Sequence, residues 1–225
     1  MKTKLTIIVV ASLLGSEVGR GETNHTVISS DRITFYEVPL VCPAAPEIGC
    51  GSRSKPILLQ LEKEASVAEA WLNRTGTLMA IVWKPETKGK ERAAAFAAVS
   101  KKEELKAQEL KSSARKKALK DFLSREGWHR GSDVDRLSEE EAGIIAARLV
   151  RRIQAKVSVS EEKAKTLRAE FTAIFKRRFL GSQDSNEPNP EERVLGVLQS
   201  HLDEKDVALL KETLPRNLRP LPGEK

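Results

Sequence analysis

The sequence has few of the residues that build disulfide frameworks, metal centres and cofactor sites. Its 225 residues include two cysteines, three histidines and only 4% aromatic residues. Two cysteines exclude a disulfide-rich scaffold, a four-cysteine zinc site within one chain and a cluster-binding ferredoxin. One disulfide or one two-thiolate site is still allowed.

Sequence motifs of common enzyme active sites are also absent. The chain contains no Gly-rich phosphate loop, no Gly-x-Ser-x-Gly and no His-Glu-x-x-His. Its many acidic residues alternate with lysines and arginines on the faces of expected helices. We therefore expect no enzymatic activity, with a Cys50 nucleophile assisted by a distant histidine as the weakest alternative.

The composition indicates a soluble, largely helical protein of one large or two small domains. Hydrophobic residues make up 40% of the chain, charged residues 32%, and the formal net charge is +7. Basic charge favours nucleic acid or an anionic membrane surface as a partner, but at residues 101–178 it alternates with glutamates, as on a solvated helix face. We expect no nucleic-acid partner, and a membrane surface stays open as an alternative.

The first 21 residues have the layout of a secretory signal peptide. Lys2 and Lys4 precede an apolar run at residues 5–15, and small residues follow. The run is well short of the roughly 20 residues that span a membrane. We expect residues 1–21 to be removed and the mature chain to be secreted or periplasmic, the alternative being an uncleaved interfacial anchor. Residues 22–31 are polar and are expected to form a linker.

Residues 32–111 show the alternating strand and helix patterns of a small α+β domain. The expected elements, in chain order, are a strand at 33–42, a loop at 42–50, a helix at 56–65 capped by Ser54, a hairpin of strands 67–74 and 77–83, a helix at 92–99, and a segment at 104–110 that is either a short edge strand or more helix. The order β-α-β-β-α-(β) predicts a ferredoxin-like domain.

The spacing of residues around Cys50 carries a resemblance to a known family. The matching positions are Cys50, the aliphatic Ile57 seven residues later, Leu61, Val67 opening the next strand, and Gly76-Thr77 in the hairpin. This pattern resembles the heavy-metal-associated domain of copper chaperones and mercury-binding periplasmic proteins. The resemblance covers residues 32–111 and implies a ferredoxin-like fold and a two-cysteine site for a soft metal ion.

The sequence departs from this family at the second cysteine of its Cys-x-x-Cys motif. Arg53 occupies that position in Cys50-Gly-Ser-Arg53, and the other cysteine, Cys42, lies upstream across a proline-containing loop. An arginine beside the site disfavours a metal cation and favours a thiolate. The start of a helix further favours the thiolate form of Cys50.

These residues support three hypotheses for Cys42 and Cys50. The leading one is binding or sequestration of Cu(I), Hg(II) or another soft metal ion, with both cysteines as metal ligands. The main alternative is a structural or protein-interaction module in which Cys42 and Cys50 form a disulfide and no metal binds. A third hypothesis is thiol redox chemistry.

Residues 112–225 are expected to form an all-α helical domain that contacts a protein partner. Ser138–Glu141 and Ser158–Glu161 have the capping-box pattern that opens a helix. Residues 127–131 are expected to form a glycine-bounded turn in which Trp128 packs against the core. The helical half weakly resembles periplasmic stress proteins of the Spy and CpxP type, and an ordinary amphipathic bundle is the alternative.

Overall fold

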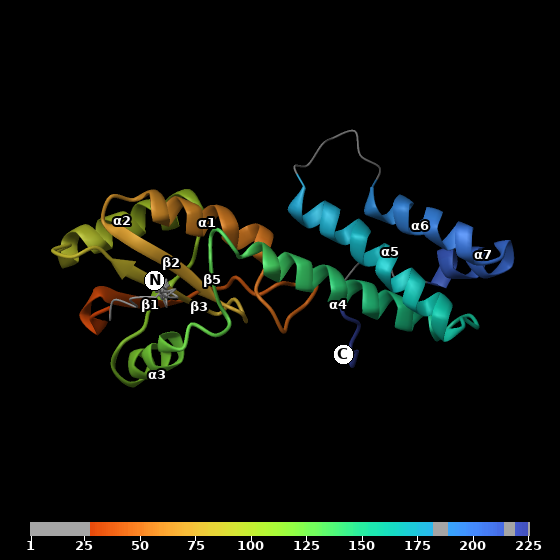
Figure 1. Ribbon diagram of the computed structural model, residues 1–225, viewed down its shortest axis with the longest axis horizontal. Helices are drawn as coiled ribbons and strands as arrows, with labels where there is room; N and C mark the ends of the chain where they lie inside the picture. The colour runs from red at the N-terminus through yellow and green to blue at the C-terminus, as the bar shows by residue number, and fades with distance from the viewer. Residues whose placement is uncertain (1–27, 182–188, 214–218, 225) are drawn as a thin grey trace, which may run out of the picture.

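The structure is a computed structural model that describes residues 28–181, 189–213 and 219–224. The expected signal peptide and most of the expected linker lie outside these residues. The described chain is a mixed α/β protein with a five-stranded antiparallel sheet and seven α-helices (Figure 1). The elements are β1 (Ile33–Glu37), α1 (Gly51–Lys63), β2 (Val67–Asn73), β3 (Leu78–Trp83), α2 (Gly89–Lys102), β4 (Gln108–Glu109), α3 (Ser112–Leu123), β5 (Trp128–Arg130), α4 (Asp135–Gln154), α5 (Glu161–Leu180), α6 (Pro190–His201) and α7 (Glu204–Thr213).

The sheet has the strand order β4-β1-β3-β2-β5, and every neighbouring pair is antiparallel. The hairpin expected at 67–83 is confirmed as β2 and β3. Its turn contains Gly76, whose φ of 72° lies in the left-handed region that glycine adopts without steric cost. The segment at 104–110 contains the short strand β4, which pairs with β1 at the edge of the sheet.

Helices α1 and α2 cover one face of the sheet (Figure 1). Alternate residues of β3, including Met79 and Trp83, point toward this face and pack with Leu58 and Leu61 of α1. The Trp83 indole N–H donates to Thr34 Oγ1 at 2.8 Å, which satisfies its only polar atom in the core.

Helix α3 covers the opposite face. Phe122 of α3 meets Phe35 of β1 edge to face, with ring centroids 5.6 Å apart, and Trp128 packs beside both rings. Gly127 and Gly131 lie in turns as expected, but the residues between them form β5, because Trp128 is buried in the core and residues 128–130 pair with β2. The expectation that Trp128 packs is confirmed.

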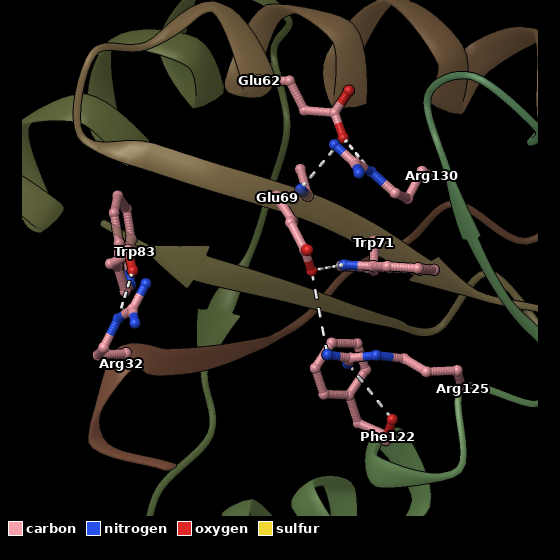
Figure 2. A network of polar contacts seen from close by, with 9 residues as sticks. Arg32, Glu62, Glu69, Trp71, Trp83, Phe122, Arg125 and Arg130 are labelled. Atoms are coloured by element: carbon pink, nitrogen blue, oxygen red, sulfur yellow. Dashed lines mark hydrogen bonds and ion pairs between the residues drawn. The ribbon is translucent and has the colours of Figure 1, made fainter. Parts of the chain in front are cut away.

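A network of polar contacts holds α3 and β5 against β2 (Figure 2). The guanidinium of Arg125 lies over the ring of Phe122, 3.6 Å from its centroid, and 3.9 Å from the carboxylate of Glu69. Glu69 also accepts a hydrogen bond from the indole N–H of Trp71 at 2.8 Å. Cation–π contacts and shared carboxylates of this kind fix α3, which follows the expected domain boundary at residue 111, on the sheet.

Helices α4 to α7 share a second apolar core. Its largest buried side chains include Phe171 and Phe175 of α5, which pack against Ile153 of α4. Ser160 caps α5 by accepting a hydrogen bond from the backbone N–H of Lys163, so the helix opens two residues later than the Ser158–Glu161 capping box predicts. Within the described ranges, no helix has the length and apolar character needed to cross a membrane.

Candidate functional site

The two cysteines lie in the loop that leads from β1 to α1. The backbone N–H of Cys42 donates to the carbonyl of Ile48 at 2.9 Å, and that of Cys50 donates to the carbonyl of Leu40 at 2.7 Å. These bonds flank an antiparallel bridge between Val41 and Gly49. Because side chains alternate along paired strands, Cys42 and Cys50 point to the same side as diagonal neighbours.

The loop is held against the β2–β3 turn through glycines. The backbone N–H of Gly49 donates to the carbonyl of Arg74 at 2.7 Å, and that of Leu40 donates to the carbonyl of Gly76 at 3.0 Å. A Cβ added at Gly49 would lie 2.9 Å from the Cα of Gly76. The absence of side chains at both glycines thus lets the cysteine loop approach the sheet closely.

Cys50 is the N-cap residue of α1. Its carbonyl accepts hydrogen bonds from the backbone N–H of Ser54 at 3.0 Å and from the Ser54 hydroxyl at 2.6 Å. The expectation that Ser54 caps the helix is wrong, because α1 begins at Gly51 and buries Ser54 within its first turns. The expected position of Cys50 at a helix start is confirmed. Its sulfur lies 3.4 Å from Ser52 Oγ.

Burial and hydrogen bonding distinguish the two thiols. Cys42 is 1% exposed, whereas Cys50 is partly exposed, and no disulfide joins them. The adjacent Cys42 thiol, with smaller contributions from Ser52 and from the backbone N–H and charge of Arg53, lowers the pKa of Cys50 to about 5. The adjacent Cys50, burial and the neighbouring Glu141 raise the pKa of Cys42.

Glu141 of α4 is the acidic group beside this pair. Glu141 lies close enough to Cys42 to raise the pKa of its thiol, and only 6% of the residue is exposed. Burial, together with the nearby Cys50, raises the pKa of the Glu141 carboxyl. The site thus consists of a partly exposed, acidic thiol, a buried thiol and a buried carboxyl.

Helix α4 carries this carboxyl to the loop because one of its faces packs on the loop and on the start of α1. Gly51 lies against Ser138, leaving no room for a Cβ. About two turns beyond Glu141, the guanidinium Nη1 of Arg148 donates to the carbonyl of Ala44 at 2.6 Å. Lys55 of α1 pairs with Asp135 of α4 at 2.5 Å.

Sequence reasoning assigned Ser138 and Glu141 to a capping box, and this interpretation is wrong. Helix α4 begins at Asp135, so both residues are internal, and the structure buries both. One signal in the sequence could have indicated burial. Glu141 lies four residues after Leu137 and four before Ile145, two apolar positions of the face that packs inward.

The predicted metal site would use Cys42 and Cys50 as its two ligands. Among the described residues, no group of three or more His, Cys, Asp or Glu side chains is arranged to hold one. The positive charge of Arg53 acts on Cys50, and the Cys42 thiol keeps its proton. His201 lies elsewhere, with its Nε2 2.8 Å from Glu170 Oε1. A two-thiolate site needs only two donors, so metal binding by Cys42 and Cys50 stays a prediction.

Comparison of the chain with protein-family models, with curated proteins and with solved structures yields no match.

Proposed function

We propose that this chain is a thiol–disulfide exchange protein whose reactive pair, Cys42 and Cys50, lies in the first loop of a ferredoxin-like domain. The element order β1-α1-β2-β3-α2-β4 and the strand order β4-β1-β3-β2 support the fold assignment. Strand β5 extends that sheet by one strand, and α4 to α7 form a helical unit appended to it.

The observation that carries the proposal is that the Val41–Gly49 bridge places the buried Cys42 and the partly exposed Cys50 on the same side as diagonal neighbours, with Cys50 at the N-terminus of α1. Thiolates are the nucleophiles and the good leaving groups of disulfide exchange. Because one sulfur is stabilised as a thiolate and the other thiol is buried, the two cysteines have different roles in the exchange reaction. Cys50 reacts with the substrate, and Cys42 closes or opens the internal disulfide.

Stabilisation of the Cys50 thiolate also favours one direction of exchange. A disulfide whose reduced form is stabilised is a stronger oxidant. In that direction a substrate thiolate attacks the Cys50 sulfur of the Cys42–Cys50 disulfide, and Cys42 leaves and takes up a proton. A second substrate thiolate then attacks the mixed disulfide and expels Cys50 as a thiolate. Two electrons pass from two substrate thiols to the cysteine pair, and an external small-molecule disulfide reoxidises it.

Equilibration in glutathione redox buffers at pH 7 tests this proposal. After thiol blocking, intact mass gives the fraction of protein that contains the internal disulfide. We expect a midpoint well above the roughly −300 mV below which structural disulfides lie. The Cys42→Ser and Cys50→Ser variants are controls that cannot form the bond.

Two results would contradict the proposal. A pair that stays oxidised across the whole buffer range is a structural disulfide, as in the main alternative from the sequence. A pair that never forms the bond is not a redox couple, and titration of the reduced protein with Cu(I) and Hg(II) would then test the soft-metal hypothesis directly.

A further inference from the structure

Glu141 is a buried acidic group beside the cysteines, and the proposed exchange reaction gives it no role. The residue is 94% buried, and its Oε2 atom has no hydrogen-bond partner within the described part of the chain. Buried polar atoms are nearly always paired, and an unpaired one calls for an explanation. Cys42, which lies beside this carboxyl, is the neighbouring titratable group that acts on it most, followed by Cys50.

The surroundings of Glu141 hold its carboxyl in this position. On its own helix, Ser138 packs against Gly51 at the start of α1, and Arg148 donates to a carbonyl of the cysteine loop. The titratable groups that act on Glu141 are Cys42 and Cys50 from the loop. The two contacts fix the backbone of α4 beside the loop on both sides of Glu141.

We infer that Glu141 is the proton acceptor for Cys42, so that α4, from the helical half of the chain, completes the site. This inference rests on the proposed exchange reaction. When Cys42 attacks a mixed disulfide on Cys50, its S–H bond breaks and the proton passes to the Glu141 carboxylate. The Cys42 sulfur bonds to the Cys50 sulfur, and the bound thiol leaves as a thiolate. In the opposite direction Glu141 returns the proton to Cys42.

The protonation behaviour of Glu141 supports this role. Burial raises the pKa of its carboxyl above the usual range, toward the pH at which general acids and bases work best. An exposed glutamate, with its lower pKa, would be a weaker base toward a buried thiol.

Reaction of the reduced full-length protein with a nitrobenzoate disulfide separates the two steps. Attack by Cys50 releases one coloured nitrothiolate, and closure of the Cys42–Cys50 bond releases the second. The first phase reports the reactivity of Cys50, on which the proposed function depends. The second phase reports deprotonation and attack by Cys42, in which Glu141 would act.

The informative variant is Glu141→Gln, which keeps the size of the side chain and removes its titration. We expect the second phase at pH 7 to slow by at least about tenfold. This is a cautious lower bound, because the loss of a positioned general base usually slows a reaction roughly a hundredfold or more. The first phase should stay within about twofold. Glu139→Gln, on the same helix but with a side chain 48% exposed and paired with Lys176, is the matched control and should change neither phase.

A purely electrostatic role for Glu141 predicts the opposite sign. The carboxylate raises the pKa of Cys42, so its removal would then speed the second phase. A second phase in Glu141→Gln that is unchanged or faster therefore overturns the inference. If the wild-type protein lacks a second phase, the proposed function itself is wrong. Failure of the proposed function can therefore be distinguished from failure of the inference about Glu141.

The wild-type protein provides a second test if Glu141→Gln does not fold. The rate of the second phase should rise with pH as Glu141 ionises, level off, and rise again as Cys42 ionises without assistance. A single continuous rise governed by one thiol overturns the inference.

Discussion

The stability of the reduced protein should increase with pH because of the Cys50 thiolate. The fold lowers the pKa of Cys50 from 9.0 to about 5. Between these values the unfolded chain binds a proton at Cys50 that the folded chain does not bind. The free energy of unfolding then rises with pH, by up to about 1.4 kcal/mol per pH unit for one proton. The contribution is lost as pH falls through 5, and it is fully present above pH 9.

Replacement of Cys50 by serine isolates this effect. Urea unfolding in excess reductant at pH 6, 7 and 8 gives the free energy of unfolding of both proteins. We expect the difference between wild type and Cys50→Ser to grow by about 1 kcal/mol per pH unit, close to the one-proton limit. Other titrating groups, such as His129, whose pKa is lowered by burial, are present in both proteins and cancel in the difference.

A smaller substitution provides the control. Ser52→Ala removes only the 3.4 Å contact to the Cys50 sulfur, and most of the pH dependence should remain. Parallel curves for wild type and Cys50→Ser, with a constant difference at all three pH values, would refute the reasoning. They would mean that Cys50 is protonated in the fold and that the adjacent Cys42 does not stabilise a thiolate.

Two further predictions concern packing, and thermal unfolding checks both. Gly51→Ala places a methyl group against Ser138 at the contact of α1 with α4 and should lower stability by about 1–3 kcal/mol. Gly143→Ala, on the exposed side of α4 where a Cβ meets no atom within 4 Å, should instead be neutral or stabilising by up to about 1 kcal/mol; equal effects at the two glycines would contradict the packing. Phe122→Ala removes the fully buried ring at the centre of the α3 face and should cost about 3–5 kcal/mol. A loss below about 1 kcal/mol would show that α3 does not hold this face.

Local sequence patterns predict the β2–β3 hairpin because its contacts are short in range. The hairpin follows from two β-branched, apolar runs separated by a turn that contains Gly76. Residues 127–131 show the limit of this approach. Gly127 and Gly131 are typical of a turn, and only the pairing of β5 with the distant β2 makes the intervening residues a strand.

The start of a helix is harder to predict when several residues can cap it. Ser54 and Ser138 are both good N-cap residues, yet both lie inside helices that begin earlier. In α1 the loop hydrogen bonds place Cys50 at the cap. In α4 the packing of Ser138 against Gly51 buries the serine. Tertiary contacts therefore outweigh the local capping preference at both positions.

The sequence by itself determined that two cysteines share one short loop and that Cys50 opens a helix next to an arginine. Those features depend on neighbours in the chain, and they favour the thiolate form of Cys50. Only the tertiary structure decided that Cys42 is buried beside Cys50, where it lowers the pKa of Cys50 most, and that Glu141 lies near both. Glu141 is remote in sequence and belongs to a helix that local patterns assign to a separate unit. The position of Glu141 follows from the packing of α4 on the cysteine loop. The burial of its carboxyl and the affinity of that carboxyl for a proton depend on the same packing.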